Sequence, residues 1–244
     1  MSSDRPRVAA FDVDGTLTTR DCVVPFLRRV AGTPQLSLKL VVNARHTVPA
    51  LVRRDRNALK EASARAVFRH RSVREIGRHA AEFARMVHTS WLEPQTLEML
   101  RAHQAAGDTV LLVSASFEVY LRPLGGLLAV DDVLAVRLEV GPDRTFTGDL
   151  SGQNCRGAEK VRRVHTWLDE HYADVGGRQG VHLTAYGDSV GDRELLLDAN
   201  TAVFVGKHQP SWLPASAREN NAGQSDGTTS GCPAAICGAL RSPQ

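Results

Sequence analysis

The chain has 244 residues and a mass of 26.5 kDa, which is enough for one sizeable domain or for a core domain that carries a smaller inserted one. With 42% hydrophobic and 23% charged residues, it has the composition of a soluble globular protein. No apolar run approaches the roughly 20 residues of a transmembrane helix, and the first residues (MSSDRPR) lack the apolar region of a signal peptide, so we expect a cytoplasmic protein without a membrane span.

The net charge of +3 conceals a strong asymmetry along the chain. Residues 18–90 contain 15 Lys and Arg against 5 Asp and Glu, a balance of +10, so the rest of the chain sums to −7. A basic segment beside an acidic remainder indicates that an anion is drawn to the place where they meet. For any single arginine, a solvated helix face is the better interpretation.

The first predicted strand, VAAF at residues 8–11, is followed by consecutive amphipathic helices with no strand among them. These predicted helices span residues 22–32, 35–54, 57–70 and 73–88. An all-helical block between the first strand and the next strand–helix unit indicates an inserted cap. We place this cap at residues 18–90 and the core at residues 1–17 and 91–207.

Later aliphatic runs predict further buried strands that alternate with helices, at residues 109–114, 133–140, 182–186 and 202–205. Such alternation favours an α/β fold with a parallel sheet that is covered on both faces. Apolar positions at helical spacing predict a helix over residues 159–172, and the turn residues within 140–150 predict a small hairpin beside the sheet. Residues 208–244 are rich in Asn, Ser, Gly, Thr and Pro and predict a mostly disordered tail.

Carboxylates and hydroxyls follow three of the predicted strands, at the edge where an open parallel sheet binds ligands: Asp12 and Asp14, Ser114 and Ser116, and Asp188 and Asp192. Crowded carboxylates repel one another, and a divalent cation with oxygen ligands relieves the repulsion, most simply Mg²⁺ held by Asp12 and Asp188. Lys160 stands at the start of the predicted helix 159–172, where the helix N-terminus already favours anions. A cation, a lysine and hydroxyls together suit a phosphoryl group.

This arrangement resembles the haloacid dehalogenase superfamily of aspartyl-phosphate hydrolases, in particular the branch that contains phosphoserine phosphatase. Four family motifs occur in order: FDVDGTLT (residues 11–18), SAS (114–116), Lys160 within NCRGAEKV, and GDSVGD (187–192). The resemblance implies a Rossmann-like core sheet with strands in the order 5-4-1-2-3. It also identifies the helical block as a C1 cap, inserted directly after the first motif.

The resemblance assigns the chemistry to the first motif. Asp12 is expected to attack phosphorus and form an aspartyl-phosphate, which splits hydrolysis into two easier steps. Asp14 is expected to protonate the leaving oxygen, to deprotonate the attacking water, and to touch the metal through its backbone carbonyl. Gly15 permits the turn that separates the two carboxylates. Aspartate at position 14 favours a phosphatase, because the dehalogenases of the superfamily lack it and the transport ATPases carry threonine there.

The other motifs are expected to hold the phosphoryl group and the metal. Ser114, Ala115 and Lys160 correspond to the phosphate-binding positions of the family, and Lys160 also eases the repulsion between the phosphate and Asp12. Asp188 is expected to complete the metal site, with Asp192 supporting it from behind.

The substrate is less sharply indicated. Phosphoserine phosphatases bind the substrate's amino group with an acidic residue shortly after the first motif, where this chain has Asp21, and a cap arginine such as Arg56 is a candidate for a carboxylate. Gly191 replaces a usual asparagine, Ala115 replaces a usual glycine, and the NCRG segment is shared with family IB hydrolases of varied substrates. We therefore expect a small phosphate monoester: phosphoserine, a sugar, cyclitol or nucleoside phosphate, or a lysophospholipid head group.

Three classes of function fit these features. The first is a magnesium-dependent phosphatase that acts on a small molecule, with no nucleic-acid partner. The second is a phosphotransferase or mutase that passes the phosphoryl group to another alcohol. The third is a non-catalytic module whose basic cap binds an anionic partner such as nucleic acid or membrane lipid.

Overall fold

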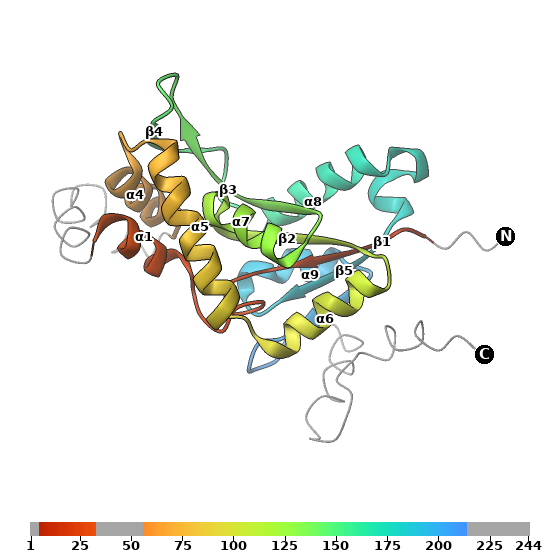
Figure 1. Cartoon of the computed structure of the whole chain (residues 1–244). Coiled ribbons are helices and arrows are strands. Elements are labelled where there is room, and N and C mark those ends of the chain that lie inside the picture. Colours follow the sequence, from red (N-terminus) through yellow and green to blue (C-terminus); the bar gives the residue numbers. More distant parts are fainter. Residues whose placement is uncertain (1–4, 33–55, 214–244) are drawn as a thin grey trace.

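The computed structural model describes residues 5–32 and 56–213 (Figure 1). The predicted helix at 35–54 and the part of the predicted tail beyond residue 213 lie outside the described residues, as does the side chain of Arg56. The first residues of the predicted tail pack on the core, because Leu213 is buried and the ring of Trp212 lies edge-on to that of Phe204 at 6.0 Å. The packed part of the chain therefore extends past the boundary predicted at residue 207.

One sheet forms the centre of the described structure, and its six strands lie in the order β4-β3-β2-β1-β5-β6. The strands are β1 (Arg7–Phe11), β2 (Thr109–Phe117), β3 (Asp132–Val140), β4 (Phe146–Ser151), β5 (His182–Gly187) and β6 (Thr201–Phe204). All neighbours are parallel except β4, which pairs antiparallel with β3 as the predicted hairpin. Without β4, the order is the predicted 5-4-1-2-3, so the expected α/β core is confirmed.

Helices cover both faces of the sheet, which explains why its strands read as continuous aliphatic runs. Figure 1 shows α6 (Pro94–Ala105) on the near side, with α8 (Ala158–His171) and α9 (Arg193–Asp198) behind. On the α6 side, the rings of Phe11 and Tyr186 stack at 4.1 Å across β1 and β5. His103 of α6 joins them, since its ring nitrogens lie 2.8 Å from the Tyr186 hydroxyl and 2.6 Å from Asp108.

Three helices, called the cap helices below, gather where β1 ends: α1 (Val23–Ala31), α4 (Arg56–Phe68) and α5 (Val73–Ser90) (Figure 1). Aromatic rings join them to α7 (Glu118–Leu128): Phe26 of α1 lies 5.2 Å from Phe83 of α5, and both contact Tyr120 of α7, at 4.7 and 5.2 Å. Such pairs add about 0.5–1.5 kcal/mol each beyond the area that they bury. This cluster fixes the cap helices over the carboxyl ends of the strands, while the division into two domains stays a prediction.

Strand β2 is irregular where the second motif lies. Its parallel register with β3 shifts between Val113 and Phe117, so that Ser114, Ala115 and Ser116 leave the regular ladder. A strand that breaks its pairing in this way re-aims side chains and frees backbone groups, and such irregularities are common beside active sites. The local break therefore directs this segment toward the end of β1.

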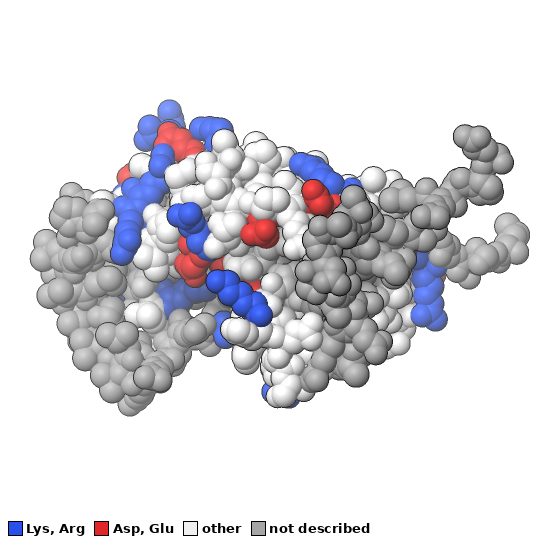
Figure 2. Space-filling view, turned by 90° about the horizontal axis from the view of Figure 1, so that it is seen from below, with Lys and Arg blue, Asp and Glu red and all other residues white. Residues whose placement is uncertain are grey.

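The charged surface agrees with the asymmetry of the sequence. Figure 2 shows Lys and Arg side chains mainly over the half of the molecule where the cap helices lie, with acidic side chains between them. Among the helices that the structure describes, none combines the length and the apolar character needed to cross a bilayer.

Candidate active site

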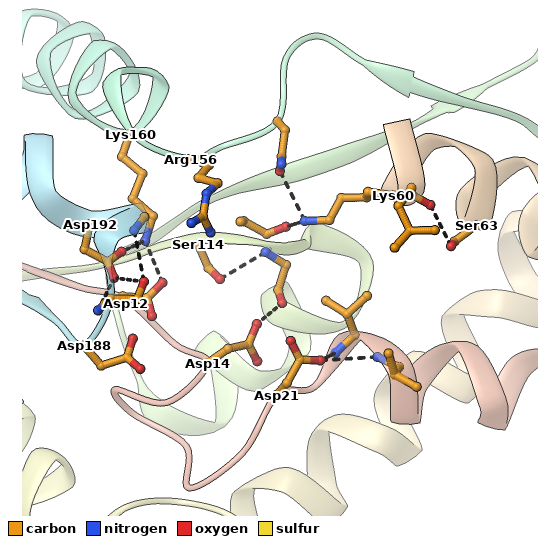
Figure 3. Close-up of a pocket in the computed structure, with 18 of the residues that line it drawn as sticks. Asp12, Asp14, Asp21, Lys60, Ser63, Ser114, Arg156, Lys160, Asp188 and Asp192 are labelled. Carbon is orange, nitrogen blue, oxygen red and sulfur yellow. Dashed lines mark hydrogen bonds and ion pairs between the residues drawn. The ribbon is translucent and has the colours of Figure 1, made fainter. Parts of the chain in front are cut away.

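A pocket of about 470 Å³ lies between the carboxyl ends of the central strands and the cap helices α1 and α4 (Figure 3). Every site residue expected from the sequence lines this pocket, except Arg56, whose side chain is not described. The expected lining residues are Asp12, Asp14, Asp21, Ser114, Ala115, Lys160, Asp188 and Asp192. The structure thus brings together residues from four separate motifs.

Lys160 is the centre of the site. The side chain is buried, and its ammonium donates three hydrogen bonds of 2.6 Å, to Oδ1 of Asp12, Oδ1 of Asp192 and the carbonyl oxygen of Val113. Burial alone lowers the pKa of this ammonium, but the charges of Asp12 and Asp192 outweigh burial and hold the pKa above its ordinary value. Lys160 is therefore a permanent cation with every donor satisfied.

Three carboxylates surround this single cation. One oxygen from each of Asp12, Asp188 and Asp192 lies within 4.8 Å of the others. Burial raises the pKa of Asp12 to about 8, although Lys160 opposes the rise, and burial followed by the charge of Asp192 raises the pKa of Asp188. The pocket therefore carries more negative charge than Lys160 can neutralise.

The donor set fits Mg²⁺, a small hard cation that prefers carboxylate and carbonyl oxygens. Both oxygens of Asp192 are already engaged, since Oδ1 accepts from Lys160 and Oδ2 accepts from the Ser189 hydroxyl at 2.8 Å. Asp12 and Asp188 are the carboxylates that remain, which agrees with the assignment of Asp192 to a supporting place.

Asp14 is held apart from that cluster by two donors. Its Oδ2 accepts a hydrogen bond from the Ser116 hydroxyl, and its Oδ1 accepts one from the backbone N–H of Cys22 at 2.8 Å. Burial raises the pKa of Asp14 above its ordinary value, against the effect of the Ser116 hydrogen bond. A carboxyl with a raised pKa in a fixed orientation suits proton transfer near neutral pH.

The second motif presents backbone and hydroxyl groups to the pocket. The Ser114 hydroxyl oxygen accepts from the backbone N–H of Ser116 at 3.1 Å. Neither serine caps α7, because the residue before that helix is Phe117 and no side chain caps it. Neither serine hydroxyl is therefore engaged at the start of that helix.

Asp21 stands at the mouth of the pocket and has a structural task as well. Its Oδ1 accepts from the backbone N–H groups of Val23, at 2.9 Å, and Val24, at 3.4 Å, at the start of α1. These two bonds satisfy backbone N–H groups of the first helical turn and fix the carboxylate toward the pocket (Figure 3). Its binding of a substrate amino group stays a prediction.

Two cationic residues of the pocket were missed by the sequence interpretation. Lys60 of α4 and Arg156 of the NCRG segment both line it. Lys60 is one of many basic residues in the cap segment, and nothing in its spacing distinguishes it from them. Arg156 had a usable indication, because it lies within four residues of Lys160 in a motif segment.

Comparison with known sequences gives a consistent result. The family model for haloacid dehalogenase-like hydrolases matches residues 9–197. Protein CicA of Caulobacter vibrioides is 33% identical over 209 residues, covering 83% of this chain and 88% of CicA. The histidinol-phosphatase of Neisseria meningitidis is 28% identical over 134 residues, covering 55% of this chain and 60% of that protein.

Solved structures share the fold. A protein of unknown function from Bordetella pertussis matches with a TM-score of 0.69 at 23% identity, covering 90% of this chain and 96% of that one. A phosphoserine phosphatase, solved as an analogue of its phospho-aspartyl intermediate, matches with a TM-score of 0.52 at 16% identity, covering 82% of this chain and 87% of that one. At these identities the likeness concerns the fold alone.

The turn after Asp14 generates a first prediction, for Gly15→Ala. Gly15 has φ of +85°, and a Cβ there would overlap Oδ2 of Asp188. We expect a displaced Asp188 and loss of the increase in melting temperature that Mg²⁺ is expected to produce in wild type, measured by thermal unfolding. Gly107→Ala is the matched control, because Gly107 has φ of +75° with nothing within 4 Å of a Cβ. That control should lose only about 1 kcal/mol of stability and keep its response to Mg²⁺; an unchanged Mg²⁺ response in Gly15→Ala would contradict the prediction.

The carboxylate cluster generates a second prediction, for Asp188→Asn. Since the three carboxylates repel one another without a cation, this variant should melt at a higher temperature than wild type in the presence of a chelator. Mg²⁺ at about a hundredfold its Kd should add about 2.7 kcal/mol to wild type and nothing comparable to the variant. Thermal unfolding with and without Mg²⁺ measures both effects, and Asp174→Asn, which removes an exposed carboxylate, is the control. A variant that responds to Mg²⁺ as wild type does would exclude Asp188 as a ligand.

Proposed function

Because the chain belongs to the haloacid dehalogenase-like hydrolase family, we propose that it is a magnesium-dependent phosphatase that hydrolyses a small organic phosphate monoester. The observation that carries this proposal is the pair formed by Asp12 and Lys160, buried together beside Asp188 at the floor of the pocket. A buried carboxylate whose charge is held by one lysine and, when bound, by Mg²⁺ is a nucleophile that a phosphoryl group can approach.

The reaction proceeds in two displacements at phosphorus. An oxygen of Asp12 forms a bond to phosphorus while the ester oxygen leaves, and protonated Asp14 gives its proton to that oxygen. Water then attacks the aspartyl-phosphate and gives a proton to Asp14, which frees phosphate and restores Asp12. The raised pKa of Asp14 supports its role as the acid of the first step.

The groups around Asp12 hold the phosphoryl oxygens during both steps. Lys160, the Ser114 hydroxyl and the backbone N–H of Ala115 are the donors assigned to this task. Mg²⁺, held by Asp12, Asp188 and the backbone carbonyl of Asp14, would neutralise charge on the transferring group. The hydrogen bonds from Lys160 to Asp192 and to Val113 keep the ammonium in place when Asp12 turns from Lys160 to phosphorus.

The leaving group is proposed to be a small alcohol, with phosphoserine and sugar or cyclitol phosphates as candidates. Phosphoserine and histidinol phosphate, the compounds in the names of two similar proteins, each carry an ammonium on the carbon next to the ester carbon. Asp21 supports such a substrate, because its Oδ1 is engaged by α1 while the carboxylate faces the pocket. A cap arginine such as Arg56 stays a proposal for a carboxylate.

The proposal predicts Mg²⁺-dependent release of inorganic phosphate from a panel of phosphate monoesters. The substitution Asp12→Asn should lower turnover by about 10⁴-fold or more, because the nucleophile is lost. A colorimetric phosphate assay measures the release, and a panel with added acceptor alcohol separates hydrolysis from phosphoryl transfer. Hydrolysis that persists in Asp12→Asn would overturn the mechanism, and product alcohol formed in excess of phosphate would favour a phosphotransferase.

The two roles of Asp14 predict a separable effect of Asp14→Asn. With p-nitrophenyl phosphate, whose leaving group needs no acid, the first displacement should proceed while the second slows by about 10²–10⁴-fold. A burst of p-nitrophenol equal to the enzyme concentration, with one phosphoryl group added to the protein mass, measures the trapped intermediate. Asp12→Asn should give no burst. A steady rate without a burst in Asp14→Asn would assign the second proton transfer to another group.

A further inference from the structure

Two cations of the pocket have no task in the proposed mechanism. Lys60 enters from the cap helix α4, and Arg156 enters from the core just before α8 (Figure 3). The phosphoryl group already has Lys160, Ser114 and the metal carboxylates around it. A second pair of positive charges at the boundary of cap and core therefore calls for its own explanation.

The guanidinium of Arg156 has no hydrogen-bond partner among the described residues. Its side chain is half-buried and lines the pocket, yet it makes no hydrogen bond or ion pair within residues 5–32 and 56–213. The absence of a side chain at Gly191 leaves it room, since a Cβ there would lie 2.8 Å from Nη1 of Arg156. Arginine presents a planar set of donors that matches carboxylate and phosphate oxygens, so this guanidinium is available to an anion.

Lys60 is placed beside it. The Lys60 ammonium donates to the carbonyl oxygen of Ala115 and, at 3.2 Å, to Oδ1 of Asn154. Burial lowers its pKa to about 8, Asp14 and Asp21 oppose this, and the nearby charge of Arg156 lowers it further. An anion between the two cations would relieve their repulsion and favour the charged form of Lys60.

Asn154 contacts both residues and so fixes their relative position. Its side-chain oxygen accepts from Lys60, while its backbone carbonyl accepts from the backbone N–H of Arg156 at 2.8 Å. On the far side, Arg156 borders a second hollow of about 580 Å³ whose lining includes Glu61 and Glu194. These carboxylates disfavour an anion there, so the open positive face is the one toward the catalytic pocket.

We propose that Lys60 and Arg156 form a binding site for a second anionic group on the leaving group of the substrate, a carboxylate or a second phosphate. This inference rests on the proposed phosphatase function and narrows it to esters that carry a further negative charge. The site joins one residue of the cap to one of the core, so binding of the second anion also ties the two parts together over the reacting phosphorus.

The test compares matched esters that differ only in the second anion. Phosphoserine against phosphoethanolamine removes a carboxylate, and a hexose bisphosphate against the hexose monophosphate lacking the distal phosphate removes a phosphate. The wild-type, full-length protein with Mg²⁺ should favour the doubly anionic member of at least one pair by about tenfold or more in kcat/KM. The pair that shows the preference identifies which anion the site takes.

The variants assign that preference to residues. The relevant ratio is kcat/KM for the doubly anionic ester divided by kcat/KM for its matched partner. Arg156→Gln and Lys60→Gln should each lower this ratio by about fivefold or more, mainly through KM, and Arg156→Lys should restore part of it. Arg162→Gln and Lys207→Gln remove exposed cations outside the pocket and should leave the ratio unchanged. An equal loss for both members of a pair, or a ratio that Arg156→Gln does not alter, would overturn the proposal.

A binding measurement separates this proposal from the function on which it rests. The variant Asp12→Asn lacks the nucleophile and can bind an ester without turning it over. In thermal unfolding with Mg²⁺, the doubly anionic ester of the preferred pair should raise its melting temperature more than the singly anionic ester does. The double variant Asp12→Asn/Arg156→Gln should lose that difference. If wild type hydrolyses no ester but this difference is present, the phosphatase proposal fails and the anion site stands. If wild type hydrolyses both members equally and the difference is absent, the phosphatase stands and the anion site fails.

Discussion

The buried ammonium of Lys160 is the interaction on which the site depends. It joins the end of β1 through Asp12, the point where β2 leaves its regular ladder through the Val113 carbonyl, and the turn after β5 through Asp192. Breaking a buried pair of this kind by removing one partner typically costs about 3–5 kcal/mol, because an uncompensated charge stays behind. The same lysine thus fixes three strands relative to one another at the edge of the pocket and presents Asp12 to it.

The cap acts on this frame from outside the sheet. The chain leaves β1, makes the turn at Gly15 and enters α1, whose first turn engages both carboxylates that face the pocket there: the Cys22 N–H binds Asp14, and Asp21 binds the N–H of Val23. The insertion point of the cap and the acid of the proposed mechanism are therefore one structural unit. A movement of α1 would change the orientation of Asp14 before it changed anything in the sheet.

The sequence predicted the parts of the site that lie at strand ends, because aliphatic runs locate buried strands and parallel strands bring their carboxyl ends to one edge. Asp12, Ser114 and Asp188 meet for this reason, and the strand order came from the family resemblance. The partners of Asp14 and the positions of Lys60 and Arg156 could not be predicted in this way. Their side chains are positioned by tertiary packing, such as the space that Gly191 leaves for Arg156. Tertiary packing of this kind produces no periodic pattern in the sequence.

The balance of charge in the pocket explains why Lys160 has a different role from Lys60 and Arg156. Among the described residues, five carboxylates and three cations line it, which leaves two negative charges before any ligand enters: Asp12, Asp14, Asp21, Asp188 and Asp192 against Lys60, Arg156 and Lys160. One Mg²⁺ cancels this excess, and a proton on Asp14 makes the pocket positive and receptive to a phosphoryl dianion. Lys160 is bonded to Asp12 and Asp192 and, in the proposed reaction, serves the phosphoryl group, so it is not available to a second anion of the substrate. A second anion on the substrate would have to meet the cations that the carboxylates leave unused, and those are Lys60 and Arg156.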